Sequence, residues 1–311
     1  MSEKIVFAAI GNFDGFHLAH QELIKTLSIK AKENNAKAVV ISFDPHPLAV
    51  LFEKPPLLLS DPGDKEQIMQ ACFNIDEVIK LSFTKELAVL PPETFVQEIL
   101  QKQLQVRHVF VGFNFTFGAK GLGNAENIHD TCARFGIEAT VLPAFSCEYG
   151  VVSSSLVREC LSDGNLAAAN KMLGYWYKFS GVTEKGNQYG RMLGFPTANI
   201  RISLSRQTPP YGVYAARAEL GGKTYDAVAN LGVKPTVTSE KLLLLETHLF
   251  GITDEDLYGC PITIYLEQFI RPEKKFNSKD ELKTAVLENI TEAKVILSGK
   301  TEKEHLPKIN A

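Results

Sequence analysis

The segment Gly11–His20 constrains the fold of this chain more than any other stretch of its sequence. It reads Gly-Asn-Phe-Asp-Gly-Phe-His-Leu-Ala-His and follows an apolar run, Ile5–Ile10, that predicts a buried strand. The residues after it, Gln21–Leu27, predict a helix. A strand, a Gly-rich turn and a helix start form a phosphate site in outline, because the first N–H groups of a helix are unpaired and lie at the positive end of its dipole.

Two histidines stand at this helix start. His17 and His20 are three residues apart, so they share one helix face and can reach the same anion. A metal site is one alternative, but the zinc-protease pattern needs histidines four apart with a glutamate between them, and here Leu18 and Ala19 intervene. A chance pair of ordinary histidines is the other alternative, and the preceding Gly-rich turn makes it less favourable.

Composition bounds the class of protein. The chain has 311 residues, enough for two domains, and 45% hydrophobic with 22% charged residues predicts a globular protein with a core. With a net charge of -3 and no long basic run, neither nucleic acid nor an anionic membrane is an expected partner. The five cysteines form no C-x-x-C pair, which favours reduced thiols over a disulfide framework. No apolar stretch is long enough to span a membrane or act as a signal peptide, so we expect a cytoplasmic protein.

The first half of the chain alternates strand-like and helical segments. Further apolar runs follow at 38–43, 78–81, 109–112 and 139–142, and a helix is predicted from about Glu93 to Gln105. Strands that are apolar throughout and alternate with helices predict a parallel sheet covered on both faces, which binds ligands at the carboxyl ends of its strands. Three loops each follow a strand and are expected together at that edge: Gly11–His20, Asp44–Pro47 and Gly112–Gly118.

The pattern of the sequence changes near residue 176. Just before this point, Leu166–Leu173 predicts a helix that ends at a glycine. Beyond it, short strands with Gly-rich turns predict an antiparallel barrel or sheet, in which Gly221-Gly222 marks a hairpin. Ser278 and Glu281 fit a capping box and predict a C-terminal helix. We therefore expect two domains, residues 1–175 and 176–311.

A second pattern suited to phosphate binding is Ser153-Ser154-Ser155-Leu156-Val157-Arg158. Serines at a helix start are common N-caps, and that interpretation stays open. Serines followed by an arginine one turn into the helix also make a phosphate clamp, because the guanidinium is a forked cationic donor.

Together these motifs resemble those of a known family. Gly-x-Phe-Asp-Gly-x-His-x-x-His, followed much later by Ser-Ser-x-x-x-Arg, is similar to the pattern of the nucleotidyltransferases, and the runs Phe43–Pro47 and Gly112–Gly118 narrow the match to the FAD synthetase module of the bacterial bifunctional riboflavin kinase/FMN adenylyltransferase family. The second half resembles the riboflavin kinase module of that family in motifs at 190–200, 212–214, 230–236, 246–249 and 269–276. The resemblance implies an α/β nucleotidyltransferase domain with a Rossmann-like parallel sheet, followed by an antiparallel β-barrel kinase domain with a C-terminal helix.

The resemblance implies a riboflavin kinase site in the second half, where the γ-phosphoryl group of ATP is transferred to riboflavin to give FMN. Glu246 is the implied general base, and Thr197 and Asn199 are the implied Mg²⁺ ligands, because hydroxyl and amide oxygens are hard ligands. The other implied ligand-binding residues are Gly186, Gly190, Arg191, Pro196, Asn230 and Arg271.

The resemblance also implies an adenylyltransferase site in the first half, where FMN and a second ATP give FAD and pyrophosphate. The FMN phosphate is already a nucleophile, so this site needs charge stabilisation rather than a strong base. The implied catalytic residues are His17, His20 and Arg158, and Mg²⁺ held largely by the phosphates is expected here too. The implied binding residues are Gly11, Phe13, Asp14, Gly15, Asp44, His46, Asn114, Ser154 and Ser155.

Two departures from the family pattern keep alternatives open. Ala19 stands where the family usually has glycine, and its methyl group either crowds the nucleotide or is harmless in a helix. The run Leu249-Phe250-Gly251 after His248 also differs from the family, so the flavin contacts there stay open. The leading hypothesis is a bifunctional enzyme acting on the small molecules ATP, riboflavin and FMN. The alternatives are a chain that keeps only the kinase activity and a flavin-binding regulator without catalysis.

Overall fold

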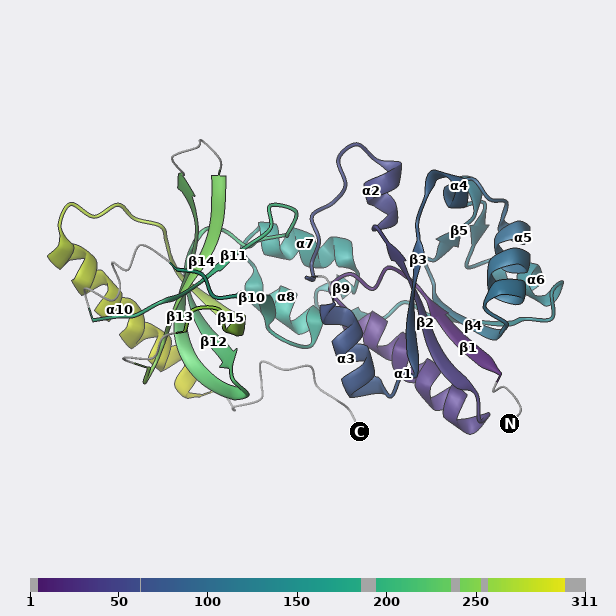
Figure 1. The fold of residues 1–311 in the computed structure, drawn as a ribbon, viewed down its shortest axis with the longest axis horizontal. Helices are drawn as coiled ribbons and strands as arrows, with labels where there is room; N and C mark the ends of the chain where they lie inside the picture. The colour runs from purple at the N-terminus through teal and green to yellow at the C-terminus, as the bar shows by residue number, and fades with distance from the viewer. Residues whose placement is uncertain (1–4, 62, 186–193, 236–240, 253–256, 300–311) are drawn as a thin grey trace. The chain divides into compact units, whose positions relative to one another are not determined.

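The computed structural model describes residues 5–61, 63–185, 194–235, 241–252 and 257–299 (Figure 1). By the contacts within the chain, Leu58–Asp61 and the residues from Ser154 onward form one compact unit, and the rest of the chain forms another. We call the unit that contains Gly11–His20 the first unit and the other the second unit. Each is described by itself.

The first unit is built on a five-stranded parallel sheet with the strand order β3-β2-β1-β4-β7. The strands lie where the apolar runs predict them: β1 (Val6–Ile10), β2 (Lys37–Asp44), β3 (Glu77–Ser82), β4 (Val106–Gly112) and β7 (Glu138–Leu142). Chain order runs outward from β1 in both directions, so the sheet has a switch point beside β1, where ligands bind in this class of fold. The predicted parallel α/β architecture is therefore confirmed.

Helices cover both faces of this sheet (Figure 1). Alternate strand residues point to opposite faces. Ala9 and Val40 belong to a cluster with α1 (Leu18–Glu33) and α3 (Asp64–Phe73), whereas Ala8 and Val39 pack with the segment Phe95–Gln103 and α6 (Ile128–Ala133). The remaining short elements of this unit are α2 (Pro47–Leu51), α4 (Lys85–Ala88), α5 (Pro92–Thr94), β5 (Thr116–Phe117), η2 (Ala119–Gly121), β6 (Gly123–Asn124), β8 (Ser146–Cys147) and β9 (Gly150–Val151).

The predicted helix at 93–105 differs from the structure in type. After the single turn of α5, Phe95–Gln103 forms a π-helix, η1, and the Leu104 N–H donates to the Ile99 carbonyl five residues earlier. In this wider helix, residues five apart lie on one face, so Phe95 and Leu100 are both buried against the sheet. Apolar spacing alone predicts a helix here without distinguishing the two types.

The second unit contains a six-stranded antiparallel sheet with the order β10-β15-β12-β13-β14-β11. Its strands are β10 (Tyr177–Val182), β11 (Ala198–Arg201), β12 (Gly212–Leu220), β13 (Lys223–Pro235), β14 (Lys241–Leu249) and β15 (Pro261–Pro272). The Glu184 N–H, just after β10, donates to the Asn199 carbonyl of β11 at 2.7 Å, which brings the two edges together into a nearly closed barrel. The predicted hairpin is confirmed: Leu220 pairs with Lys223, and both intervening glycines have positive φ.

Within the described residues of the second unit, three helices accompany the barrel. The predicted C-terminal helix is α10 (Lys279–Ser298), whose N-cap Ser278 accepts a hydrogen bond from the Glu281 N–H at 3.1 Å. It packs on one sheet face, with Ile290 and Leu297 in a cluster with Val213 of β12. The other two helices are α7 (Ser154–Ser162) and α8 (Leu166–Leu173). Both belong to the second unit by their contacts, whereas the sequence places a boundary after residue 175.

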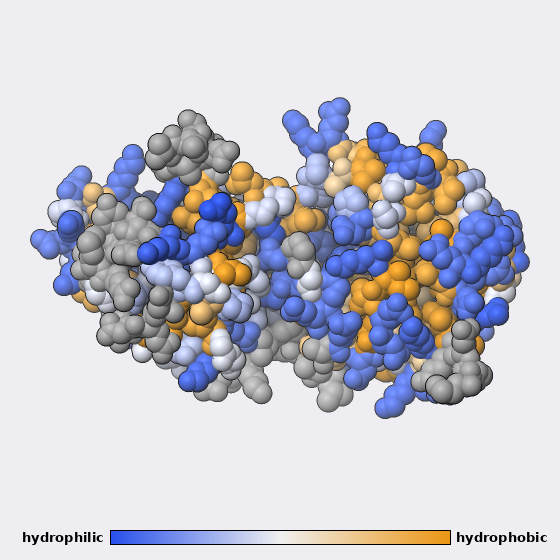
Figure 2. All heavy atoms as spheres, in the orientation of Figure 1, coloured by the Kyte–Doolittle hydropathy of each residue, from blue (hydrophilic) through white to orange (hydrophobic). Residues whose placement is uncertain are grey.

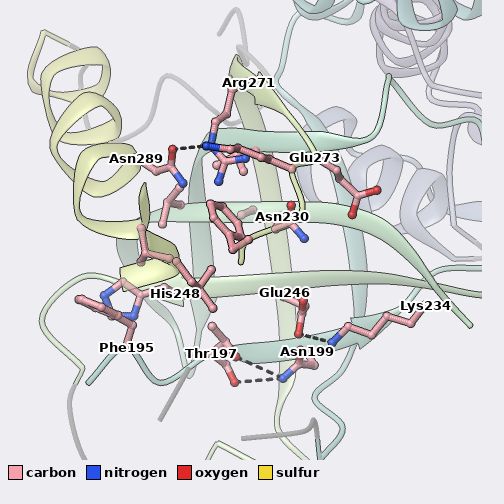
Figure 3. Close-up of a pocket in the computed structure, with 17 residues that line it drawn as sticks. Phe195, Thr197, Asn199, Asn230, Lys234, Glu246, His248, Arg271, Glu273 and Asn289 are labelled. Atoms are coloured by element: carbon pink, nitrogen blue, oxygen red, sulfur yellow. Dashed lines mark hydrogen bonds and ion pairs between the residues drawn. The ribbon is translucent and has the colours of Figure 1, made fainter. Parts of the chain in front are cut away.

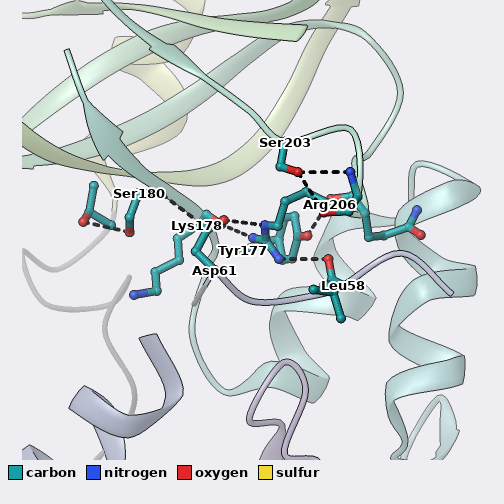
Figure 4. A network of polar contacts seen from close by, with 10 residues as sticks. Leu58, Asp61, Tyr177, Lys178, Ser180, Ser203 and Arg206 are labelled. Carbon is teal, nitrogen blue, oxygen red and sulfur yellow. Dashed lines mark hydrogen bonds and ion pairs between the residues drawn. The ribbon is translucent and has the colours of Figure 1, made fainter. Parts of the chain in front are cut away.

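A tetrapeptide from the first half of the sequence, Leu58–Asp61, belongs to the second unit because Arg206 binds it (Figure 4). The Arg206 side chain is 2% exposed and lies 2.9 Å from the Asp61 carboxylate. Its guanidinium also donates to the carbonyls of Leu58 and Lys178, both at 2.9 Å. A buried guanidinium is stable only when paired and hydrogen-bonded in this way.

Among the described residues, no helix is both long and apolar enough to cross a bilayer. On the face drawn in Figure 2, hydrophilic side chains are interspersed with apolar ones on both units.

Candidate active sites

One row of residues crosses five strands of the barrel. Asn199 of β11 pairs with Glu246 of β14, which pairs with Asn230 of β13; Asn230 pairs with Val213 of β12, and Val213 pairs with Arg271 of β15. Residues directly opposite each other on neighbouring strands point to the same face of a sheet. Four residues that the sequence singles out in separate motifs are therefore brought into one line.

This row lines a cavity of about 320 Å³ in the second unit (Figure 3). Part of its wall is apolar and comes from the sheet, from Phe276 and from α10, through Leu282 and Val286. Another part is polar and contains Thr197, Asn199, Asn230, Lys234, Glu246, Arg271 and Glu273. Pockets for small organic ligands have this character, an apolar body with a few polar groups that fix orientation.

Glu246 is held at the polar side of the cavity by Lys234. The Lys234 Nζ atom lies 2.7 Å from the Glu246 Oε1 atom, and the carboxylate is 26% exposed (Figure 3). An ion pair of this kind fixes the direction of the carboxylate while one oxygen stays able to accept a proton from a ligand.

Thr197 and Asn199 both line the cavity and are hydrogen-bonded to each other (Figure 3). The Asn199 Nδ2 group donates to the Thr197 carbonyl at 3.2 Å, and the Asn199 Oδ1 atom is buried without a hydrogen-bond partner. A buried oxygen with no partner is costly in a protein, and a hard cation would satisfy it. The described residues contain no cluster of three His, Cys, Asp or Glu side chains that could hold a metal ion.

Arg271 stands at the far end of the row. Its Nε–H donates to the buried Asn289 of α10 at 3.0 Å, and its guanidinium lies 5.7 Å from the ring centre of Phe276. The helix therefore fixes the arginine beside the cavity. Three other implied ligand-binding residues, Gly186, Gly190 and Arg191, lie outside the described residues.

His248 is a cavity residue to which the sequence assigned no role. Its Nδ1 atom lies 2.9 Å from the Pro196 carbonyl, so the Nδ1–H form donates a hydrogen bond there. Its ring packs edge-on against Phe195 at 5.7 Å between ring centres. Burial lowers the pKa of His248, which favours the neutral ring. The sequence signal for His248 is its position two residues after Glu246, because residues two apart in a strand lie on the same face.

This contact predicts a positioning role for His248. His248→Leu removes the hydrogen bond that fixes the Pro196 carbonyl, directly before Thr197 in the chain. We expect FMN formation to fall about 10-fold, the lower end of the losses caused by removing a group that orients a ligand. His248→Asn keeps an N–H donor near the Nδ1 position and should retain most of the activity. Steady-state kinetics with both variants checks this, and equal losses in the two would contradict the positioning role.

In the first unit, the loop after β1 is shaped by two buried rings. Phe13 and Phe16 are 0% and 1% exposed and pack in the core, although both have positive φ. Phe13, an implied ligand-binding residue, therefore supports the loop with its side chain and lies edge-on to His20 at 5.2 Å between ring centres. Gly15 has a φ of 77°, which glycine adopts without strain.

The two histidines meet at the N-terminus of α1. His17 is the N-cap, and its Nδ1 atom accepts a hydrogen bond from the His20 N–H at 3.4 Å. The two rings are stacked, with centres 3.7 Å apart and planes at 15°. Burial, together with the neighbouring charges of His17 and Lys65, lowers the pKa of His20, and its Nδ1 atom is buried without a hydrogen-bond partner. His20 is thus a neutral ring with a polar atom that a ligand can satisfy.

The other implied residues of the first unit follow β2 and β4, the strands on either side of β1. Asp44 is the last residue of β2 and is exposed, and His46 caps α2 by accepting from the Leu48 N–H at 3.2 Å. Asn114 follows β4 and is exposed. Parallel strands end at one edge of the sheet, so these residues share that edge with the Gly11–His20 loop, as predicted.

Ser154, Ser155 and Arg158 lie in the first turns of α7, which belongs to the second unit. Ser155 is exposed, and Arg158 is half-buried. Arg158 and the two histidines therefore belong to different units.

Lys65 is a charged group of the first unit that the sequence analysis missed. It lies in the first turn of α3, and its Nζ atom donates to the Asn12 carbonyl at 2.7 Å and to the Ser42 hydroxyl at 2.9 Å. It stands in no motif, so only the folded chain shows that it reaches the loop after β1.

Comparisons with known proteins match the chain in two parts. A family model described as FAD synthetase matches residues 2–156, and one described as riboflavin kinase matches residues 173–297. The bifunctional riboflavin kinase/FMN adenylyltransferase of Escherichia coli K12 is 37% identical over 281 residues, which cover 89% of this chain and 88% of that protein. The chain belongs to the bifunctional riboflavin kinase/FMN adenylyltransferase family.

Another member of this family, from Bacillus subtilis, is 35% identical over 291 residues, covering 92% of this chain and 90% of that protein. A crystal structure described as a macrolide-efflux protein from Streptococcus pneumoniae has the same fold, with a TM-score of 0.84 and 28% identity over 94% of this chain and 95% of that one. Membership of the family makes this chain an enzyme that phosphorylates riboflavin to FMN and adenylylates FMN to FAD. The cavity lies in the part matched by the kinase model, and the histidine loop lies in the part matched by the synthetase model.

Proposed function

We propose that the cavity in the second unit is the riboflavin kinase site and that Glu246 is its general base. The row Asn199–Glu246–Asn230–Val213–Arg271 is the observation that supports this, because it gathers a base, hard oxygen donors and a cation along one wall. In the reaction, Glu246 accepts the proton of the terminal ribityl hydroxyl while that oxygen attacks the γ-phosphorus of ATP and ADP leaves.

Thr197 and Asn199 are the proposed Mg²⁺ ligands of this site. The unpartnered Asn199 Oδ1 atom supports that role. Mg²⁺, when bound, offsets the negative charge of the ATP phosphates. The apolar wall of the cavity suits the flat isoalloxazine ring, and the Arg271 guanidinium, fixed by Asn289, is placed to meet polar or anionic groups of the ligands.

The adenylyl-transfer site is proposed at the carboxyl edge of the first unit's sheet, in the loop from Gly11 to His20. There an oxygen of the FMN phosphate forms a bond to the α-phosphorus of ATP, and the bond from that phosphorus to the bridging oxygen breaks as pyrophosphate leaves. The N-terminus of α1 and a neutral His20 acting as a hydrogen-bond donor stabilise the developing charge. The proposed roles of Ser154, Ser155 and Arg158 in adenylyl transfer rest on their sequence motif, and Mg²⁺ is expected to be held largely by the phosphates.

The proposed division of labour follows the sequence boundary, with adenylyl transfer in residues 1–175 and the kinase in residues 176–311. An assay of riboflavin with Mg-ATP that resolves flavins over time tests both activities together. We expect FMN to appear first and FAD to follow from it. FMN without FAD would favour a chain that keeps only the kinase activity, and tight flavin binding without ATP consumption would favour a regulator.

Ala19 gives a separate test of the adenylyl site. It is the second residue of α1, whose first turn forms normally with alanine there. Because a helix interior favours alanine over glycine by about 1 kcal/mol, we expect Ala19→Gly to leave FAD formation from FMN within about threefold of the parent enzyme. A gain in rate of more than about tenfold would show that the methyl group crowds the nucleotide, as the departure from the family pattern allows.

A further inference from the structure

Adenylyl transfer places negative charge on the α-phosphate and on the departing pyrophosphate, so the site needs a source of positive charge. His20 is a poor source, because burial lowers its pKa well below the usual value. The helix dipole supplies only about half an elementary charge at the N-terminus of α1. A full cation near the loop would therefore contribute strongly to catalysis.

Lys65 is such a cation, and three chain segments define its place. It extends from the first turn of α3 and donates to the Asn12 carbonyl of the β1 loop at 2.7 Å and to Ser42 of β2 at 2.9 Å. Ser42 lies two residues before the end of β2 and is 1% exposed. The ammonium group is thus held at the carboxyl edge of the sheet, between the loops that follow β1 and β2.

The charge state and the donor count of Lys65 suit an anionic ligand. Two of its three N–H groups are used by Asn12 and Ser42, and within the described part of the chain no contact is recorded for the third. Burial lowers its pKa, while the carboxylates of Glu66, Asp14 and Asp44 favour the charged form. Asp14 and Asp44 are themselves implied ligand-binding residues of the two loops, which places the amine among the groups expected to surround the nucleotide.

We propose that Lys65 is a catalytic residue of adenylyl transfer, whose ammonium group binds the substrate phosphates and offsets the charge that moves onto pyrophosphate. This inference rests on the proposed location of the adenylyl site. Lys65 transfers no proton: the FMN phosphate oxygen bonds to the α-phosphorus, and the electron pair of the broken bond leaves with pyrophosphate. Its hydrogen bonds to Asn12 and Ser42 orient the amine and use two of its three N–H groups.

The experiment compares Lys65→Arg, Lys65→Gln and Lys65→Met in the full chain, with FMN and Mg-ATP supplied and FAD measured. A cation at the phosphates predicts a fall in kcat/KM of about 100-fold or more for both Gln and Met, and a smaller fall, about 10-fold, for Arg. If Lys65 merely ties the loop to β2, Gln retains the N–H donors and should match or exceed Arg, which would overturn the proposal.

Two controls separate the possible failures. FMN formation from riboflavin, measured on the same preparations, should be unchanged in every variant, which shows that the chain is folded. Lys37→Met removes a lysine at the start of β2, at the opposite end of that strand from Ser42 and paired with Glu77, and should leave FAD formation unchanged. If His20→Leu abolishes FAD formation but Lys65→Met does not, the site is confirmed and the role of Lys65 is rejected.

The reverse reaction measures the KM for pyrophosphate, which a purely structural role of Lys65 would leave unchanged. With FAD and pyrophosphate as substrates, loss of the cation should raise the KM for pyrophosphate about 10-fold or more in Lys65→Gln, because the ammonium group binds that product directly. An unchanged KM for pyrophosphate in a folded variant contradicts the proposal.

Discussion

Glu246→Gln should lower FMN formation at least about 100-fold, the usual loss when a positioned general base is removed. The substitution keeps the shape of the side chain and its place between Asn199 and Asn230, but the amide cannot accept the ribityl proton. The loss should appear in kcat, because the base acts as the proton is transferred. The measurement is steady-state FMN production from riboflavin and Mg-ATP.

Two controls accompany Glu246→Gln. FAD formation from supplied FMN uses the other site of the same chain and should be unchanged. Glu219 lies in β12 at the end away from the cavity residue Val213, and it accepts a hydrogen bond from Tyr265 at 2.9 Å. Glu219→Gln removes this carboxylate and should leave kcat unaffected. Undiminished FMN formation by Glu246→Gln would remove Glu246 from the role of base.

His20→Leu should lower FAD formation by about 100- to 1000-fold, the cost of removing one preorganised donor from a site that stabilises developing charge. Leucine preserves much of the packing against Phe13 and removes both ring nitrogens. The Nδ1 atom has no hydrogen-bond partner, so the substitution removes no bond at that nitrogen, and we expect the unfolding temperature to stay close to that of the parent enzyme.

The matched control for His20→Leu is His129→Leu. His129 lies in α6, is 74% exposed and is paired with Asp130, so its loss should not affect FAD formation. FMN formation from riboflavin should be unchanged in both variants. A His20→Leu enzyme that makes FAD at the normal rate would exclude the histidine loop as the adenylyl-transfer site.

Much of the fold is predictable because it is encoded locally. The apolar runs of β1, β2 and β4 predict buried strands, shorter apolar runs indicate the edge strands β3 and β7, and alternation with helices favours a parallel sheet. The hairpin at Gly221-Gly222 is equally local, because two consecutive residues with positive φ favour glycine. Less local features are missed: the π-helix at Phe95–Gln103 has the same apolar spacing signal as an α-helix, and the binding of Leu58–Asp61 by Arg206 joins residues far apart in the sequence.

The residues of the candidate sites also fall into two groups, those that local motifs indicate and those that only the folded chain brings to the site. Motifs identify Glu246, Asn199, His17 and His20, because their residue types and spacings suit the chemistry. Motif analysis does not find their neighbours: Lys65 contacts Asn12 and Ser42, and His248 contacts Pro196, but no spacing in the sequence predicts these contacts.

The sequence by itself therefore determines the two-part architecture and the family of this enzyme and indicates the proposed reacting groups, since hydrophobic periodicity and short motifs are properties of neighbouring residues. Only the tertiary structure decides which distant groups meet. Register across five strands aligns Asn199, Glu246 and Arg271 along one cavity, and packing of α3 beside the β1 loop delivers the Lys65 amine to it. Contacts of this kind depend on the path of the whole chain, and so even the Gly11–His20 segment shows its full set of partners only when folded.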